Sequence, residues 1–230
     1  MPPSLSVGGE TVEYTVRRGA GKRYTYFRFK PDLTLDVVLP RTGKVDPETA
    51  IKSRLGWIVR EYRRVSAARR VLEVGKVMYG GAYLEIVYSP DCRAELVPEL
   101  DRGRVFTPTT DKRATKELIR RWFLKETSSY VVPEVSDLAP LLGVRPSRVD
   151  VREIGKWGYC TRGGRLSFSW QLAALPDRLR EYVVLHELTH LRVFSHSRQF
   201  RTILSGVCPD FRERERELDA IIPYSRLALA

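Results

Sequence analysis

The chain has 230 residues, 43% of them hydrophobic and 30% charged, and its 40 Lys and Arg against 28 Asp and Glu give a formal net charge of +12. This length and composition are typical of a soluble globular protein with one large domain or two small ones. No apolar run approaches the roughly 20 residues of a membrane-spanning helix, and the first ten residues lack the basic and apolar segments of a signal peptide. We therefore expect a cytoplasmic protein without a membrane partner. The oligomeric state is not indicated.

The positive charge is spread along the chain but is densest in residues 51–70, which carry seven basic side chains against the single acid Glu61. A field of this sign favours nucleic acid, anionic surfaces or acidic substrates. Solvated arginines that serve only solubility explain the charge equally well. Non-specific nucleic acid is therefore one partner that the sequence allows.

The three cysteines are odd in number and far apart, at Cys92, Cys160 and Cys208. They contain no C-x-x-C pair, so they do not indicate a disulfide framework or a zinc ribbon. We expect free thiols, with Cys160 among the residues of the predicted functional site.

Residues 11–40 alternate short apolar and polar runs, which predicts antiparallel strands joined by tight turns. Asp46 before Pro47 then predicts the start of a helix with basic residues on its outer side. The apolar side chains at helical spacing, which we expect to face the core, are Ile51, Leu55, Ile58, Tyr62 and Val65.

Two further strand-like runs follow at 77–89 and 93–100. Thr109 or Thr110 is expected to cap a helix over 111–128, and Pro133 to close that segment. We place a domain boundary near residue 105. It separates a β-rich N-terminal region with one basic helix, 1–105, from a catalytic domain, 106–230.

In the second domain, residues 148–154 predict a strand, and residues 155–170 predict a hairpin that turns at Gly163-Gly164. Ser167 and Ser169 fall on the hairpin face opposite Leu166, Phe168 and Trp170. Pro176 starts the next helix. The chain as a whole is therefore predicted to be an α+β protein, in which a β-hairpin lies beside a helix that carries the chemistry.

That helix contains the sequence H-E-x-x-H, and all three histidines of the chain, His186, His190 and His196, lie in or just after it. Residues four apart share one helix face, so His186 and His190 can offer ring nitrogens to one zinc ion at about 2.0–2.1 Å. His196 would lie about 240° round an unbroken helix, so the chain must turn first. We expect Ser195 or Ser197 to cap the helix that comes after the turn.

Glu187 lies next to His186 and is expected to act as the general base rather than as a ligand. Three protein ligands leave one position on zinc for water, whose pKa the ion lowers and whose proton a nearby carboxylate can take. The sequence therefore predicts one zinc ion per chain. In the metzincin pattern a glycine enables the turn before the third histidine, whereas Val193 stands at that position here.

The five-residue motif alone is also compatible with polar residues at the edge of a core. The clustering of every histidine at ligand spacing favours the metal site. A glutamate of the R-E-R-E-R-E run at 212–217 is an alternative third ligand or a partner of a histidine ring, and a salt-bridged surface helix is the other interpretation of that run.

Several motifs around the histidines carry a family resemblance. They are Lys156-Trp157-Gly158 with Cys160, Leu166 to Trp170, Tyr182-Val183-Val184 with His186-Glu187-Leu188, His196 with Phe200, and Pro209-Asp210. On these motifs residues 152–211 resemble the YgjP-like family of predicted metallopeptidases, which is similar in its metal motif to the SprT-like and WLM proteases. The resemblance implies a zincin-type α+β domain with zinc held by the three histidines.

Two positions depart from that family's usual pattern, with Tyr159 in place of Ser and Ser169 in place of Asn. Because both lie on the hairpin that borders the substrate cleft in zincins, the substrate preference is not carried over. The expected cleft residues are Trp157, Tyr159, Ser167, Ser169 and Arg198. Tyr159 or Arg198 could donate a hydrogen bond to the oxyanion, although an aromatic side chain beside a hairpin often serves packing.

The function favoured by these features is a zinc endopeptidase, since an edge strand beside the metal helix can hold an extended peptide. A narrower hypothesis is a protease that acts on DNA-bound proteins. The alternative from another class is a nucleic-acid-associated protein with a structural zinc site. Three protein ligands plus water would support the enzyme, and four protein ligands the binding protein.

Overall fold

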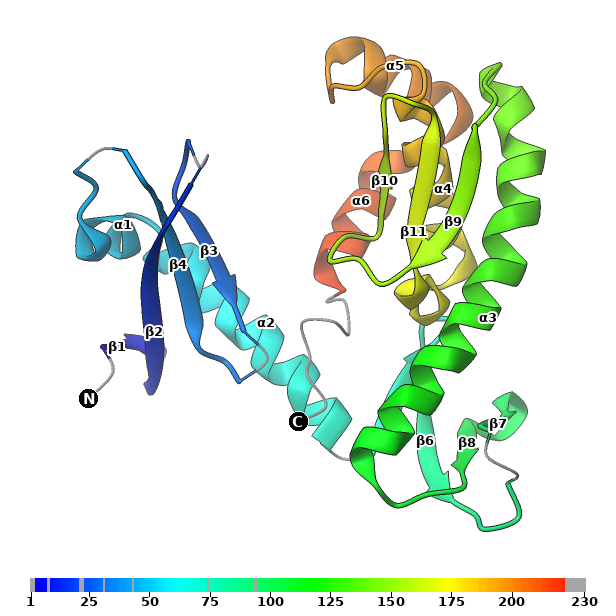
Figure 1. Cartoon of the computed structure of the whole chain (residues 1–230), viewed down its shortest axis with the longest axis horizontal. Helices are drawn as coiled ribbons and strands as arrows, with labels where there is room; N and C mark the ends of the chain where they lie inside the picture. Colours follow the sequence, from blue (N-terminus) through cyan, green and yellow to red (C-terminus); the bar gives the residue numbers. More distant parts are fainter. Residues whose placement is uncertain are drawn as a thin grey trace. The chain divides into compact units, whose positions relative to one another are not determined.

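The computed structural model describes residues 3–7, 9–20, 23–30, 32–42, 44–73, 75–92 and 95–221. It forms two compact units, which separate in sequence near residue 74 (Figure 1). The predicted turn residues 21–22, the start of the predicted strand at 93–94 and the basic side chains of Arg69 and Arg70 lie outside the described residues. Among the described residues no helix is both long and apolar enough to cross a membrane. The α+β class predicted from the sequence is confirmed.

The first unit begins with a four-stranded sheet in the order β1-β2-β4-β3. Its strands are β1 (Ser4–Val7), β2 (Glu10–Gly19), β3 (Tyr26–Phe29) and β4 (Leu35–Pro40). The β3–β4 pair is antiparallel as predicted, and β1, which was not predicted, pairs with β2 in the same way, but β2 and β4 pair in parallel. All six residues of β4 are buried, five of them apolar and the sixth Asp36. Such a strand belongs at the centre of a sheet, between β2 and β3.

Two helices, α1 (Pro47–Ser53) and α2 (Leu55–Glu73), stand where one was predicted. Asp46 caps α1, and its side chain accepts a hydrogen bond of 2.8 Å from the Thr49 amide. The helix breaks at Arg54, which shifts the helical phase of α2 and leaves Leu55 41% exposed. The rest of the predicted stripe is buried, at Ile51, Ile58, Tyr62 and Val65.

The second unit opens with a four-stranded sheet in the order β5-β6-β8-β7. It contains β5 (Lys76–Tyr79), β6 (Ala82–Tyr88), β7 (Val97–Glu99) and β8 (Arg104–Thr107), with the 3-10 helix η1 (Leu100–Arg102) between the last two. At the tip of the β5–β6 hairpin, the amides of Gly80 and Gly81 donate to the carbonyl oxygens of Ala173 and Ala174, at 2.9 and 2.8 Å. These bonds join the sheet to the C-terminal part of the chain. Residues 75–105, which were predicted to belong to the N-terminal region, therefore lie in the second unit.

The helix α3 (Lys112–Leu138) is longer than predicted. Its N-cap is Asp111, whose side chain accepts a hydrogen bond of 2.6 Å from the Ala114 amide, rather than Thr109 or Thr110. Pro133 lies inside the helix and does not end it. A proline there removes one backbone hydrogen bond, and the burial of Val131 and Val135 on either side of it offsets the loss.

The remaining elements form the core around the predicted site. They are η2 (Ala139–Leu142), β9 (Arg148–Arg152), β10 (Gly158–Cys160), β11 (Arg165–Ser169), η3 (Trp170–Ala174), α4 (Asp177–His190), α5 (Arg198–Val207) and α6 (Phe211–Ala220). The predicted hairpin is β10–β11, with Gly164 at its turn in the left-handed region and β9 parallel to β11. The sheet order β10-β11-β9 leaves β10 at an edge, next to α4 (Figure 1).

Candidate active site

Helix α4 carries the H-E-x-x-H sequence on the part of its surface that is not buried in the core. Leu179, Val183, Leu185 and Leu188 are at most 3% exposed and pack into the cluster formed with α3, β11 and α5. His186, between these positions, is only half-buried. The apolar spacing of the helix therefore fixes its rotation and turns the histidine face toward the surface.

The chain leaves α4 through a tight turn without glycine. The carbonyl oxygen of Thr189 accepts hydrogen bonds from the amides of Arg192 and Val193, at 3.0 and 3.1 Å. In the described part of the chain Leu33 is the non-glycine residue with a positive φ, so Val193 needs no left-handed conformation. The turn that the metzincin pattern makes with glycine is made here with ordinary backbone angles.

The next helix, α5, brings the third histidine back to the first two. The N-cap of α5 is Ser197, one of the two residues predicted for this role. The Ser197 hydroxyl accepts a hydrogen bond of 3.4 Å from the Phe200 amide. His196 directly precedes this cap. The sequence separation of six residues is thus bridged by a turn and a capped helix start.

The three imidazole rings converge. Their centroids lie 4.8–5.0 Å apart, and Nε2 of His186 lies 3.0 Å from Nε2 of His196. One nitrogen from each of His186, His190 and His196 lies within 4.8 Å of the other two. Within the described residues this is the group of three potential ligands that could hold a metal ion.

Three kinds of contact orient the rings. Phe200, 2% exposed, lies beneath all three with centroid distances of 4.6–5.0 Å. Nδ1 of His190 lies 3.1 Å from the carbonyl oxygen of Val193, and an N–H donated there leaves Nε2 as the metal-binding atom. The Tyr182 hydroxyl lies 3.4 Å from Nδ1 of His186. The ring positions are therefore set by the protein itself.

The protonation states of the first two histidines suit metal binding. Burial, followed by the neighbouring rings of His190 and His196, lowers the pKa of His186 to about 3. Burial also lowers the pKa of His190. Metal ligation needs neutral imidazole, so these two rings need not lose a proton at neutral pH. Three imidazole ligands fit a divalent first-row transition metal.

Glu187 is held directly beside this group. Its side chain is buried, with the residue 6% exposed, and Oε2 has no hydrogen-bond partner among the described residues. Burial raises the pKa of Glu187 to about 8. Buried carboxylate oxygens are normally hydrogen-bonded, so an unpartnered one points to a polar group that the protein itself does not supply. This observation fits a metal site with water or substrate beside Glu187.

A cavity of about 200 Å³ opens beside Glu187. Three elements form its walls: the β10 hairpin, α4 and α6. The lining residues are Trp157, Gly158, Tyr182, Val183, His186, Glu187, Glu215, Leu218 and Asp219. Of the five residues expected to line a substrate cleft, the structure brings Trp157 to this cavity.

Tyr159 and the two serines lie elsewhere. Cross-strand pairing aligns Tyr159 with Ser167 and Ser167 with Asp150, on the sheet face opposite Gly158. Ser167 is fully buried and donates a hydrogen bond of 2.8 Å to Asp150. Ser169, 1% exposed, accepts a hydrogen bond from the Gln171 amide and caps η3. The structure therefore gives the serines internal contacts and directs Tyr159 away from Glu187, which argues against the oxyanion role considered for it.

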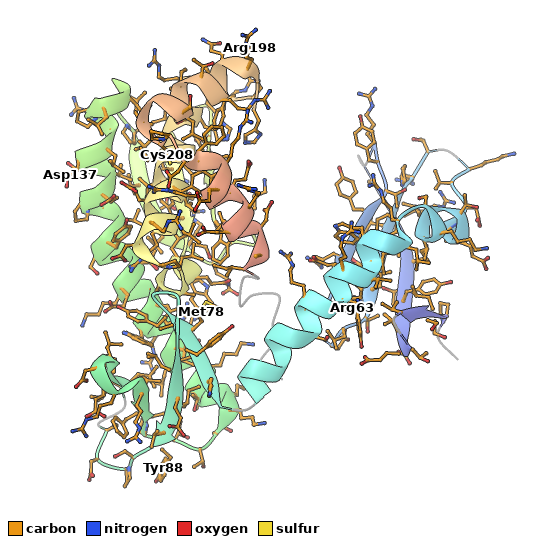
Figure 2. The ribbon with its side chains drawn as sticks, turned by 180° about the vertical axis from the view of Figure 1, so that it is seen from behind. Arg63, Met78, Tyr88, Asp137, Arg198 and Cys208 are labelled. Atoms are coloured by element: carbon orange, nitrogen blue, oxygen red, sulfur yellow. The ribbon has the colours of Figure 1, made fainter. Side chains whose placement is uncertain are left out.

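Arg198 is exposed at the first position of α5 and projects outward (Figure 2). It is not among the residues that line the cavity. The structure gives no support to its role as an oxyanion donor.

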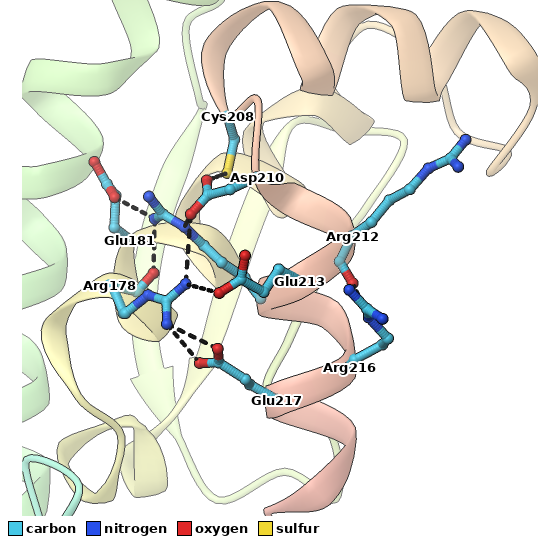
Figure 3. Close-up of polar contacts among 9 residues, drawn as sticks. Arg178, Glu181, Cys208, Asp210, Arg212, Glu213, Arg216 and Glu217 are labelled. Atoms are coloured by element: carbon cyan, nitrogen blue, oxygen red, sulfur yellow. Dashed lines mark hydrogen bonds and ion pairs between the residues drawn. The ribbon is translucent and has the colours of Figure 1, made fainter.

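The acids of the 212–217 run are divided between two flanks of α6. On one flank, Arg178 of α4 pairs with Glu217 and Glu213, at 2.8 and 3.2 Å (Figure 3). Arg214 pairs with Asp210 at 2.9 Å and also with Glu181. These ion pairs attach α6 to α4. They also engage Glu213 and Glu217, which were considered as alternative metal ligands.

Sequence reasoning did not identify Phe200 as the floor of the site, or Glu215 and Asp219 as cavity residues. The spacing of the two acids, four residues apart, was a usable signal that they share one helix face. Which element that face meets is a tertiary property and was not visible.

Comparison with known proteins relates this chain to one family and one solved structure. The model of the YgjP-like family, described as a YgjP-like metallopeptidase domain, matches residues 23–221. A similar solved structure is the metallopeptidase zymogen abylysin of Pyrococcus abyssi, which is 21% identical, with a TM-score of 0.36, and the match covers 38% of this chain and 90% of that chain. The comparison with curated proteins gave no significant match.

Proposed function

Because the chain belongs to the YgjP-like metallopeptidase family, we propose that it hydrolyses peptide bonds with one zinc ion held by His186, His190 and His196. The observation that carries the proposal is the convergence of three imidazole rings beside a buried carboxylate without a partner among the described residues. Zinc, when bound, lowers the pKa of a water molecule and polarises a carbonyl group. Three protein ligands leave room for this chemistry, whereas a structural site is usually closed by a fourth.

Glu187 is the general base in this proposal. Its burial raises its pKa, and a carboxylate with a raised pKa is a better proton acceptor when it is ionised. The same group can then return the proton to the leaving amine. Glu187 is 6% exposed and lines the cavity, so the cavity is its route for proton exchange.

The edge strand β10 supports peptide rather than small-molecule substrates. It contacts α4 and pairs with β11 along one edge. Its other edge is the end of the sheet and has no neighbouring strand among the described residues. An extended peptide added to this edge would run past Glu187 and His186. A protein or peptide chain cleaved internally is the substrate that this arrangement suits.

The test uses Glu187→Gln, which keeps the size of the side chain but cannot take a proton. With an unfolded protein as substrate, cleavage should fall by roughly 10²- to 10⁴-fold, the usual contribution of a general base. Zinc content should stay at the wild-type value. Glu153→Gln, at an exposed position, is the matched control and should cleave like wild type. Equal cleavage by Glu187→Gln at equal zinc content would contradict the mechanism.

A further inference from the structure

The cavity beside Glu187 has an acidic wall. Glu215 and Asp219 lie one turn apart on α6 and both line the cavity. Within the described chain, no Lys or Arg forms an ion pair with either of them, while Asp210, Glu213 and Glu217 on the other flank are all paired (Figure 3). The acids of α6 are thus paired where they face Arg178, whereas those that line the cavity have no ion-pair partner among the described residues.

This arrangement has a cost in the free protein. Like charges at i and i+4 on a helix repel each other and destabilise the helix slightly. Burial, and next the charge of Glu215, raise the pKa of Tyr182, which also lines the cavity. On a chain with a net charge of +12, a local acidic cavity stands out. A cation placed between the two carboxylates would relieve their repulsion.

The other walls suit a long aliphatic side chain. Trp157, Tyr182 and Leu218 contribute aromatic and apolar surface to the same cavity. Lys and Arg combine an aliphatic stem with a charged end, and the end is also attracted to aromatic faces. A volume of about 200 Å³ is smaller than the roughly 300–1,000 Å³ of a typical small-molecule site, so it suits a single side chain.

The cavity also opens directly onto the reacting groups. Glu187, buried and with Oε2 unpartnered among the described residues, shares its wall with His186. A peptide whose carbonyl is held at the histidines would therefore place a neighbouring side chain in the cavity. The acidic wall and the unpartnered carboxylate are separate observations, and both point to substrate at this place.

We propose that this cavity is a subsite for a Lys or Arg side chain adjacent to the bond that is cleaved, with Glu215 and Asp219 as its specificity-determining residues. The proposal rests on the proposed peptidase function and narrows its substrates to peptides with a basic residue beside the cleaved bond. Acidic residues at that position are excluded by repulsion from the same two carboxylates.

The first test compares peptides that differ only at one position beside the cleaved bond, carrying Lys, norleucine or Glu. Wild type should cleave the Lys peptide with a kcat/KM about two- to fivefold above the norleucine peptide, as expected for charge pairs with exposed carboxylates such as Glu215 and Asp219. The double variant Glu215→Gln/Asp219→Asn should cleave the Lys and norleucine peptides with equal kcat/KM. Glu215→Lys should cleave the Glu peptide with the highest kcat/KM of the three. Glu213→Gln, which removes the same charge from the other flank of α6, should keep the ratio.

A second measurement does not depend on turnover. The same peptides with an N-methylated amide at the cleaved position resist hydrolysis, and their binding to the zinc-loaded protein is measured by calorimetry. Tighter binding of the Lys peptide, lost in the double variant, supports the subsite. Equal kcat/KM or equal affinity for the Lys and norleucine peptides overturns it. If no peptide is cleaved at all, the peptidase function fails, and the binding comparison still decides the subsite.

Discussion

A Cβ atom on Gly158 would lie 2.8 Å from Cγ of Glu187 and 3.0 Å from its Oε1. Real Cβ atoms do not come as close as 2.8 Å to another heavy atom, so any residue with a Cβ at this point would force the Glu187 side chain or the strand to shift. The φ of Gly158 is not in the left-handed region, which means that space rather than backbone freedom requires the glycine. The edge strand therefore packs directly against the proposed general base.

The first prediction is that Gly158→Ala displaces Glu187 and impairs catalysis. The added methyl group must push the carboxylate away or move the strand, and overpacking of this kind costs roughly 1–3 kcal/mol of stability. We expect kcat/KM to fall at least about tenfold while zinc content is kept, because small errors in the position of a catalytic group have large effects. Gly155→Ala is the control, since its Cβ would meet nothing within 4 Å. Unchanged activity in Gly158→Ala would show that the contact does not position Glu187.

The second prediction concerns the metal. Purified protein should carry about one zinc per chain, and His186→Ala, His190→Ala and His196→Ala should each lower the occupancy, because each removes one ligand. Metal analysis after dialysis against a weak chelator measures this. Ser195→Ala, an exposed position in the turn before α5, should keep the metal. Full zinc content in His196→Ala would assign the third-ligand role to another residue, such as a glutamate at 213–217.

The third prediction is a pH dependence of stability in the metal-free protein. Burial raises the pKa of Glu187 from its ordinary 4.5 to about 8, so the folded state holds this proton more tightly than the unfolded state. The contribution of Glu187 to the free energy of unfolding therefore falls as pH rises from about 4.5 to about 8, by a few kcal/mol in total. Glu187→Gln has no such proton. The difference in free energy of unfolding between Glu187→Gln and wild type should therefore grow in favour of the variant between about pH 4.5 and 8, and stay constant above that range.

Urea unfolding of both metal-free proteins at several pH values measures this difference. His186, whose pKa is lowered to about 3, adds a slope of opposite sign: stability rises between about pH 3 and 6.5. That slope is common to both proteins and cancels in the comparison. A difference between wild type and Glu187→Gln that stays constant from about pH 5 to 9 would contradict the raised pKa.

The fourth prediction concerns the basic helix of the first unit. Arg60 and Arg63 of α2 are exposed, whereas Arg64 lies 3.0 Å from Glu61 and is partly neutralised. We expect weak, salt-sensitive binding to DNA or RNA with little sequence preference, reduced by Arg60→Gln/Arg63→Gln. Fluorescence anisotropy with labelled duplexes at several salt concentrations measures it, and Arg198→Gln in the second unit is the control. Undetectable binding at low salt would remove the nucleic-acid hypothesis, and with it the protease for DNA-bound proteins.

Much of the local structure could be predicted from the sequence because short-range rules set it. Asp46 caps its helix, Gly163-Gly164 turns the hairpin, and Ser197 caps α5, each through contacts with residues only a few positions away. The spacing of His186 and His190 needed no more than helix geometry. Pro133 and Leu55 were misjudged because burial by distant elements and a single helix break outweighed the local preference.

By itself, the sequence determined which residues can carry the chemistry, since three histidines and one glutamate within eleven residues need only a helix and a turn to meet. Tertiary structure alone decided what surrounds them. The faces of Tyr159 and Ser167 depend on strand pairing, the fit of Gly158 against Glu187 depends on how a sheet edge meets a helix, and the acidic wall depends on the rotation of α6. Those contacts join residues far apart in the chain, and their geometry is set by the packing of the whole core rather than by any local preference.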